Sequence, residues 1–93
     1  MEEVTRVRLP RGKEIIGVID EILGASRFTI RCVDGNKRIC RLPGKFRARI
    51  RVRVGDVVIV EPWDIEPKEK GDVIWIYNRT HAAWLHRNGY LKV

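Results

Sequence analysis

The fold is decided by the sequence RFTIRCVDGNKRICRL, residues 27–42. Side chains of two kinds alternate along its first part: the apolar ones are Phe28, Ile30 and Cys32, and the polar ones are Arg27, Thr29 and Arg31. Such alternation is typical of a β-strand with one buried face. Asp34 and Gly35 follow, a dipeptide that strongly favours a two-stranded hairpin. The sequence therefore predicts a β-hairpin that is apolar inside and basic outside.

The second strand of this hairpin should run over residues 37–42. Cys40 and Leu42 can face inward while Ile39 and Arg41 face outward. Arg38 shares the inward parity, so we expect it near the end of the strand. Pro43 and Gly44 then stop the strand.

Three further strands and one helix are expected around the hairpin. Residues 14–23 suit a strand bent or bulged near Gly17, because the glycine and the β-branched residues disfavour a helix. The turn at Gly55 and Asp56 leads into a buried strand over residues 57–63. After a polar loop, residues 64–72, a fifth strand covers 73–77. A short helix at 81–87 should be capped by Asn78 or Thr80 and ended by Asn88 and Gly89.

Residues 45–53 have both helical and extended features, and we expect a short helical turn followed by an extended piece. Five short strands with a helical turn between the third and fourth are the layout of the OB-fold, which binds oligonucleotides on its second and third strands. The predicted fold is all-β, a five-stranded OB-fold barrel with a short C-terminal helix. Its parts are an N-terminal arm (1–13), the barrel (14–78), and the helix and tail (79–93).

The positive charge of the chain is concentrated in KRICRLPGKFRARIRVR, residues 37–53, which holds eight basic residues and no acid. The chain has 19 basic and 12 acidic residues, so the remainder has 11 against 12 and is nearly neutral. Charge concentrated on one face attracts a polyanion, and arginine binds phosphate in a forked geometry. The predicted RNA-binding residues are Arg27, Arg31, Arg41, Lys45, Arg47, Arg49 and Arg51.

Enzyme chemistry finds no support in the sequence. Cys32 and Cys40 lack the further ligands of a zinc site and should be packed thiols. Ser26, the only serine, has no histidine near it in sequence, and no phosphate-binding glycine loop occurs. Trp63, Trp75 and Trp84 could stack on bases but are expected to pack in the barrel and against the helix. We predict no metal, cofactor or membrane segment, and a monomer in the cytoplasm.

Several motifs, in order along the chain, resemble the translation initiation factor 1A family. They are GASRF (24–28), CxDGxKRIC (32–40), PGK (43–45), RVxxGDVVIVxPW (51–63), DVIWxY (72–77) and WLxxxGYL (84–91). The resemblance covers roughly residues 5–91, and the short termini are similar to those of archaeal members. It implies an OB barrel that binds small-subunit ribosomal RNA at the aminoacyl (decoding) site and promotes placement of initiator tRNA alongside other initiation factors.

The resemblance also assigns residues. Arg27 matches a basic RNA-contacting position, and Lys45, Arg47 and Arg49 fall in the family's basic run. Many members have tryptophan where this chain has Arg51, so a stacking contact there would become guanidinium stacking or a phosphate contact. Two other readings stay open: a general OB-fold RNA-binding domain, which usually stacks bases on several exposed aromatics, and a structural ribosomal protein.

Overall fold

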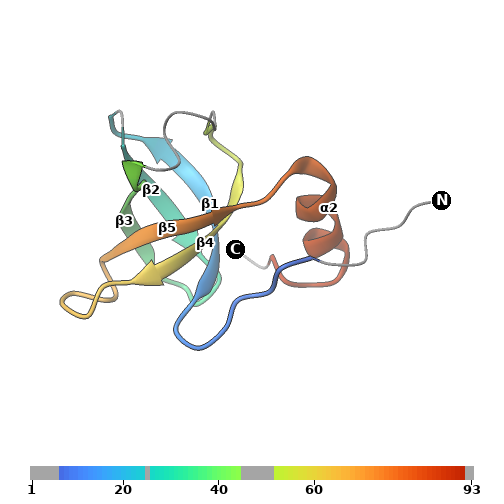
Figure 1. The fold of residues 1–93 in the computed structure, drawn as a ribbon, viewed down its shortest axis with the longest axis horizontal. Helices are drawn as coiled ribbons and strands as arrows, with labels where there is room; N and C mark the ends of the chain where they lie inside the picture. The colour runs from blue at the N-terminus through green and yellow to red at the C-terminus, as the bar shows by residue number, and fades with distance from the viewer. Residues whose placement is uncertain (1–6, 25, 45–51, 92–93) are drawn as a thin grey trace.

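The computed structural model describes residues 7–24, 26–44 and 52–91. Five strands form a closed barrel in the order β1-β2-β3-β5-β4. Their bounds are β1 (Ile15–Ile22), β2 (Arg27–Cys32), β3 (Lys37–Arg41), β4 (Val57–Pro62) and β5 (Lys70–Ile76). Helix α2 (Arg79–Arg87) follows and lies on the side of the barrel away from the β2–β3 hairpin (Figure 1). The predicted OB-fold barrel with a C-terminal helix is confirmed.

The β2–β3 hairpin has the predicted register. Antiparallel pairing places Arg27 opposite Arg41 and Arg31 opposite Lys37. Gly35 adopts a φ of 94° in the turn, a value that a side chain would strain. The inward residues Phe28, Ile30, Cys32 and Cys40 are buried, and Arg27, Arg31 and Arg41 are exposed, as predicted.

Strand β1 carries a bulge at Asp20, because Ile19 pairs with Ile30 while Glu21 already pairs with Thr29. The bulge was predicted near Gly17, which instead allows two strands to approach closely. A Cβ built on Gly17 would lie 2.5 Å from Cγ2 of Ile30. The glycine is therefore required by packing against β2.

Strand β4 is buried on both faces, which explains its unbroken apolar sequence. Val58 and Val60 point into the barrel core, while Val57 and Ile59 belong to a second cluster with Leu85 of α2. The helix thus covers the outer face of a barrel strand. A strand buried on both sides does not need to alternate apolar with polar residues.

Both ends of α2 have the capping residues that the sequence indicated. The Asn78 side chain accepts a hydrogen bond of 2.7 Å from the backbone N–H of His81. At the other end Gly89 has a φ of 81°, and the Tyr90 N–H donates to the Leu85 carbonyl. The helix begins at Arg79, two residues before the predicted start.

Two further sequence expectations differ from the structure, the start of β5 and the burial of two tryptophans. Strand β5 begins at Lys70 and not at residue 73, because Lys70, Gly71 and Asp72 pair in parallel with β3 and close the barrel. Trp84 packs against the second cluster, as expected, whereas Trp75 is 40% exposed and Trp63 is only half-buried. Among the described residues, no helix has the length and apolar content of a membrane span.

Candidate nucleic-acid interface

A row of four cations lies on the outward face of the β2–β3 hairpin. We call Arg27, Arg31, Lys37 and Arg41 the basic row; it is formed by two cross-strand pairs, one at each end. Thr29 and Ile39 pair between them, and Ile39 is 43% exposed. The row therefore offers charged groups at two ends and an apolar side chain at its centre, a combination that suits phosphates flanking a sugar or base.

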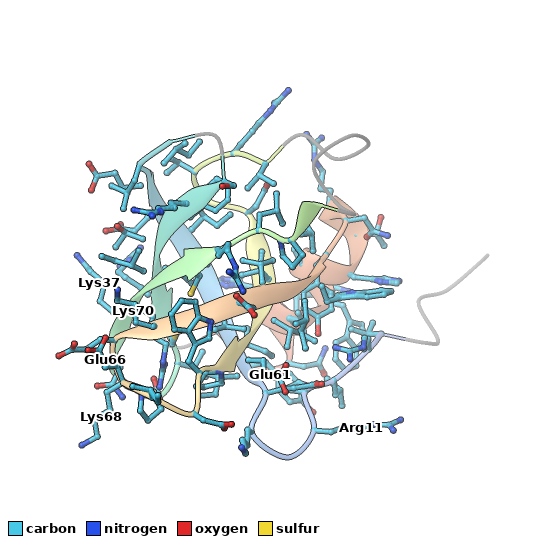
Figure 2. The ribbon with its side chains drawn as sticks, turned by 60° about the vertical axis from the view of Figure 1, so that its left-hand side comes forward. Arg11, Lys37, Glu61, Glu66, Lys68 and Lys70 are labelled. Atoms are coloured by element: carbon cyan, nitrogen blue, oxygen red, sulfur yellow. The ribbon has the colours of Figure 1, made fainter. Side chains whose placement is uncertain are left out.

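Asp20 binds two members of the row at once. One of its carboxylate oxygens lies 3.3 Å from Nε of Arg31, and the other lies 3.2 Å from Nζ of Lys37. The carboxylate comes from the bulge in β1, the strand next to β2. One end of the row is therefore held by a neighbouring strand. Figure 2 shows Lys37 at the left-hand edge of the molecule, near Lys70.

Asp72 of β5 binds the other end of the row. Its Oδ1 lies 3.3 Å from Nε of Arg41 and accepts a 3.0 Å hydrogen bond from the indole N–H of Trp63. The Arg41 guanidinium also lies 5.4 Å from the centre of the Trp63 ring, a cation–π contact. Arg41 is thus oriented by a carboxylate and an aromatic ring while its side chain stays 60% exposed.

Arg27 and Arg41 face each other directly across the two strands. Like charges in this position destabilise a sheet by a few tenths of a kcal/mol. Asp72 offsets the charge of Arg41, whereas within the part of the chain that the structure describes no carboxylate is in ion-pair contact with Arg27. An exposed pair of this kind does not stabilise the barrel, and its positive charge is open to solvent.

Arg38, the fifth basic residue of the hairpin, is not part of the surface. It is only 3% exposed and binds both oxygens of Asp34, at 3.1 and 2.9 Å. Its Nε donates to the carbonyl of Pro67 in the β4–β5 loop. The hydrogen bonds from Arg38 lower the pKa of Asp34 from 3.8 to about 2. Arg38 is the second residue of β3, close to the strand end as its inward parity suggested, and the turn balances its charge.

Three of the seven predicted RNA-binding residues, Arg27, Arg31 and Arg41, lie together on this surface. The remaining four, Lys45, Arg47, Arg49 and Arg51, fall outside the described residues, as does most of the predicted helical turn. Lys37 and Ile39 complete the surface and were not predicted as site residues. The cross-strand pairing with Arg31 and Thr29 was the signal that could have identified them.

The two cysteines are packed thiols. Cys32 and Cys40 are free and buried in the barrel core. Burial raises the pKa of both, that of Cys40 to about 12. In the described ranges, histidine, cysteine and carboxylate side chains do not gather in groups of three or more that could hold a metal ion.

The start of the described chain, at Val7 and Arg8, is fixed against the barrel on the side of α2. The Tyr77 hydroxyl donates a hydrogen bond to the carbonyl of Arg8, and Val7 packs on the second cluster. The Arg8 guanidinium lies 3.3 Å from Glu14 and 5.3 Å from the centre of the Trp75 ring. Arg11 projects into solvent, well away from Lys37 (Figure 2), whereas Lys13 lines a pocket together with Arg41 and Asp72.

Comparison with known proteins identifies the family. The family model described as translation initiation factor 1A / IF-1 matches residues 4–93. The chain belongs to this family. Its relatives include the translation initiation factor 1A of Methanothermobacter thermautotrophicus, 50% identical over 99% of this chain and 93% of that protein. That of Pyrococcus abyssi is 47% identical over 95% of this chain and 78% of that protein. Family members are initiation factors and not enzymes.

Solved structures agree with the family assignment. The solution structure of a translation initiation factor from the Wolbachia endosymbiont of Brugia malayi matches with a TM-score of 0.54 and 33% identity. The match covers 72% of this chain and 79% of that one. YjeQ from Thermotoga maritima matches with a TM-score of 0.58 and 24% identity, over 71% of this chain but 23% of that chain. The likeness to YjeQ extends to the fold alone.

Proposed function

We propose that this member of the translation initiation factor 1A / IF-1 family binds small-subunit ribosomal RNA near the aminoacyl (decoding) site. There it promotes placement of initiator tRNA, together with other initiation factors in the cytoplasm. The observation that carries the proposal is the basic row on the β2–β3 face of an OB barrel. This is the face on which OB-folds bind oligonucleotides.

The proposed RNA-binding surface extends beyond the row along the sequence. Lys45, Arg47, Arg49 and Arg51 follow β3 directly in an acid-free segment and add four cations. Phosphate contacts from arginine and lysine provide affinity and position a protein on RNA, without reading its sequence. Recognition of one ribosomal site therefore depends on how the cations of the basic row are arranged around the exposed Ile39 and the half-buried Thr29.

The test is binding to small ribosomal subunits, measured against salt concentration for Arg27→Ala, Arg47→Ala and Arg49→Ala. Each lost phosphate contact should reduce the slope of log K against log salt by about 0.7–0.9. A lost charged hydrogen bond should weaken binding about tenfold or more. Thermal unfolding should be nearly unchanged, since exposed substitutions usually alter stability within about 0.5 kcal/mol.

Arg11→Ala is the matched control, because it removes the same charge from an exposed side chain that projects into solvent away from Lys37 (Figure 2). Its binding and salt slope should equal those of the unmodified protein. If the three variants bind like Arg11→Ala, the basic surface is not the binding face. A protein that stays on the subunits through a high-salt wash would be a structural ribosomal component and not an initiation factor.

A further inference from the structure

Two aspartates on different strands bind the basic row in the same way. Asp20 of β1 and Asp72 of β5 lie on the strands that flank the β2–β3 hairpin on either side. Each approaches an arginine of the row most closely through Nε, at 3.3 Å in both cases. A carboxylate near RNA-binding arginines would repel phosphate, so its presence at both ends requires an explanation.

The geometry of the two contacts provides one. A guanidinium has five N–H donors in a rigid plane. When a carboxylate binds at the Nε edge, the nitrogen on the far side points away from that carboxylate and keeps its two N–H groups for another acceptor. The side chains of Arg31 and Arg41 remain 48% and 60% exposed after the contact. Both arginines are therefore restrained at one edge and open to a phosphate at another.

The surroundings strengthen the restraint at each end. Asp20 uses its second oxygen for Lys37, so one carboxylate fixes two cations from two strands. Asp72 is itself held by the Trp63 indole N–H, at 3.0 Å, and the Trp63 ring lies beside the Arg41 guanidinium. Ordering a long side chain on binding reduces affinity by about two- to tenfold, and prior restraint avoids this loss.

We propose that Asp20 and Asp72 are positioning residues that hold Arg31 and Arg41 for one phosphate arrangement, so that the factor selects its ribosomal site over other RNA. The inference rests on the proposed function and adds a source of specificity to it. Through their negative charge, the aspartates lower the affinity for every RNA. By restraining the two arginines, they raise the affinity for the matching site alone, and there this gain exceeds the loss. Specificity of this kind comes from disfavouring wrong partners as well as favouring the right one.

The experiment measures dissociation constants for small ribosomal subunits and for poly(U), with Asp20→Asn, Asp72→Asn and the control Asp64→Asn. Asp64 is paired with Lys13, at 3.1 Å, and lines the same pocket as Arg41 and Asp72. The control therefore removes a nearby charge without removing an ion pair of the row. Asp20→Asn and Asp72→Asn should bind the subunits about three- to tenfold more weakly. Their binding to poly(U) should be equal or tighter, because the net charge rises by one.

A second arm shows that the aspartate acts through the arginine. Arg31→Lys keeps the charge but has neither Nε nor a planar fork. Asp20→Asn should therefore cause a smaller loss of subunit binding in the Arg31→Lys background than alone. Asp20→Glu, which retains the carboxylate, should recover part of the selectivity. Thermal unfolding of each variant shows whether a loss of binding reflects a loss of folding.

Each result has a defined meaning. Tighter binding of Asp20→Asn to both RNAs would overturn the proposal, because the aspartates would then only compete with phosphate. Equal selectivity in Asp20→Asn and Asp64→Asn would also overturn it. If the unmodified protein itself does not prefer the subunits to poly(U), the proposed function fails, and it fails independently of the aspartates.

Discussion

Replacing Asp34 by asparagine should destabilise the protein strongly, although Asp34 is at a turn and partly exposed. The reason is its partner: Arg38 is 3% exposed and loses its counter-ion. Removing one member of a buried ion pair typically destabilises by about 3–5 kcal/mol. The Pro67 carbonyl still accepts from Arg38, and asparagine can accept one bond, so we expect about 2–4 kcal/mol.

The pH dependence measures one part of this loss, the part that comes from protonation of Asp34. The folded-state pKa of Asp34 is depressed to about 2 from 3.8, so the stabilisation is complete above pH 3.8 and is lost as pH falls through about 2. A shift from 3.8 to 2 corresponds to about 2.4 kcal/mol. The Asp34 side chain is 32% exposed, and solvent screening reduces this to about 1–2 kcal/mol.

Urea unfolding at pH 7 and at intervals between pH 4.5 and about 2 is the assay. Asp34→Asn should unfold at lower urea at pH 7 and should lack the loss of stability that the unmodified protein shows on acidification. Arg38→Met, which removes the buried charge, should restore stability to Asp34→Asn. A cost below about 0.5 kcal/mol at pH 7, together with parallel acid profiles, would show that the pair does not secure the hairpin.

Two further predictions concern the barrel core. Gly17→Ala should lower the free energy of unfolding in urea by about 1–3 kcal/mol, because its Cβ would lie 2.5 Å from Ile30. Gly24→Ala is the control and should change little, since the space around Gly24 is open. Equal effects of the two substitutions would refute the packing argument. Cys32 and Cys40 should react with a thiol reagent at pH 8 only as fast as the protein unfolds, since both are buried and their pKa values are raised. Rapid labelling of the folded protein would contradict this.

Local sequence pattern was sufficient for the hairpin and its two faces. Alternation places Arg27 and Arg31 outside and Phe28 and Ile30 inside, and the structure agrees because one face must be buried. The start of β5 could not be read in this way. Lys70, Gly71 and Asp72 resemble a turn, and they form a strand because β3 is available for parallel pairing.

The location of the candidate site was predictable from the sequence, but the ion pairs that orient its arginines were not. Charge concentration indicated the arginines of the hairpin, since only residue types and spacing are needed for that. The ion pairs with Asp20 and Asp72 join residues that are not neighbours in sequence. Parity placed Arg38 on the inward side of its strand, but sequence could not show which groups balance its buried charge. That balance depends on Asp34 and the Pro67 carbonyl coming together around the Arg38 guanidinium.

The closed barrel also determines when the chain can complete its fold. Each strand pairs with two others. The second partner of β3 is β5, and the second partner of β1 is β4, whose Val60 pairs with Ile15. Both of these partners are synthesised after β3. During synthesis, β1, β2 and β3 emerge as a sheet with two unpaired edges. At about 5–20 residues per second, β5 follows β3 by about 2–7 s. During that interval the unpaired edges of β1 and β3 could pair with a strand of another chain. Pairing with β4 and β5 closes the barrel and covers both edges.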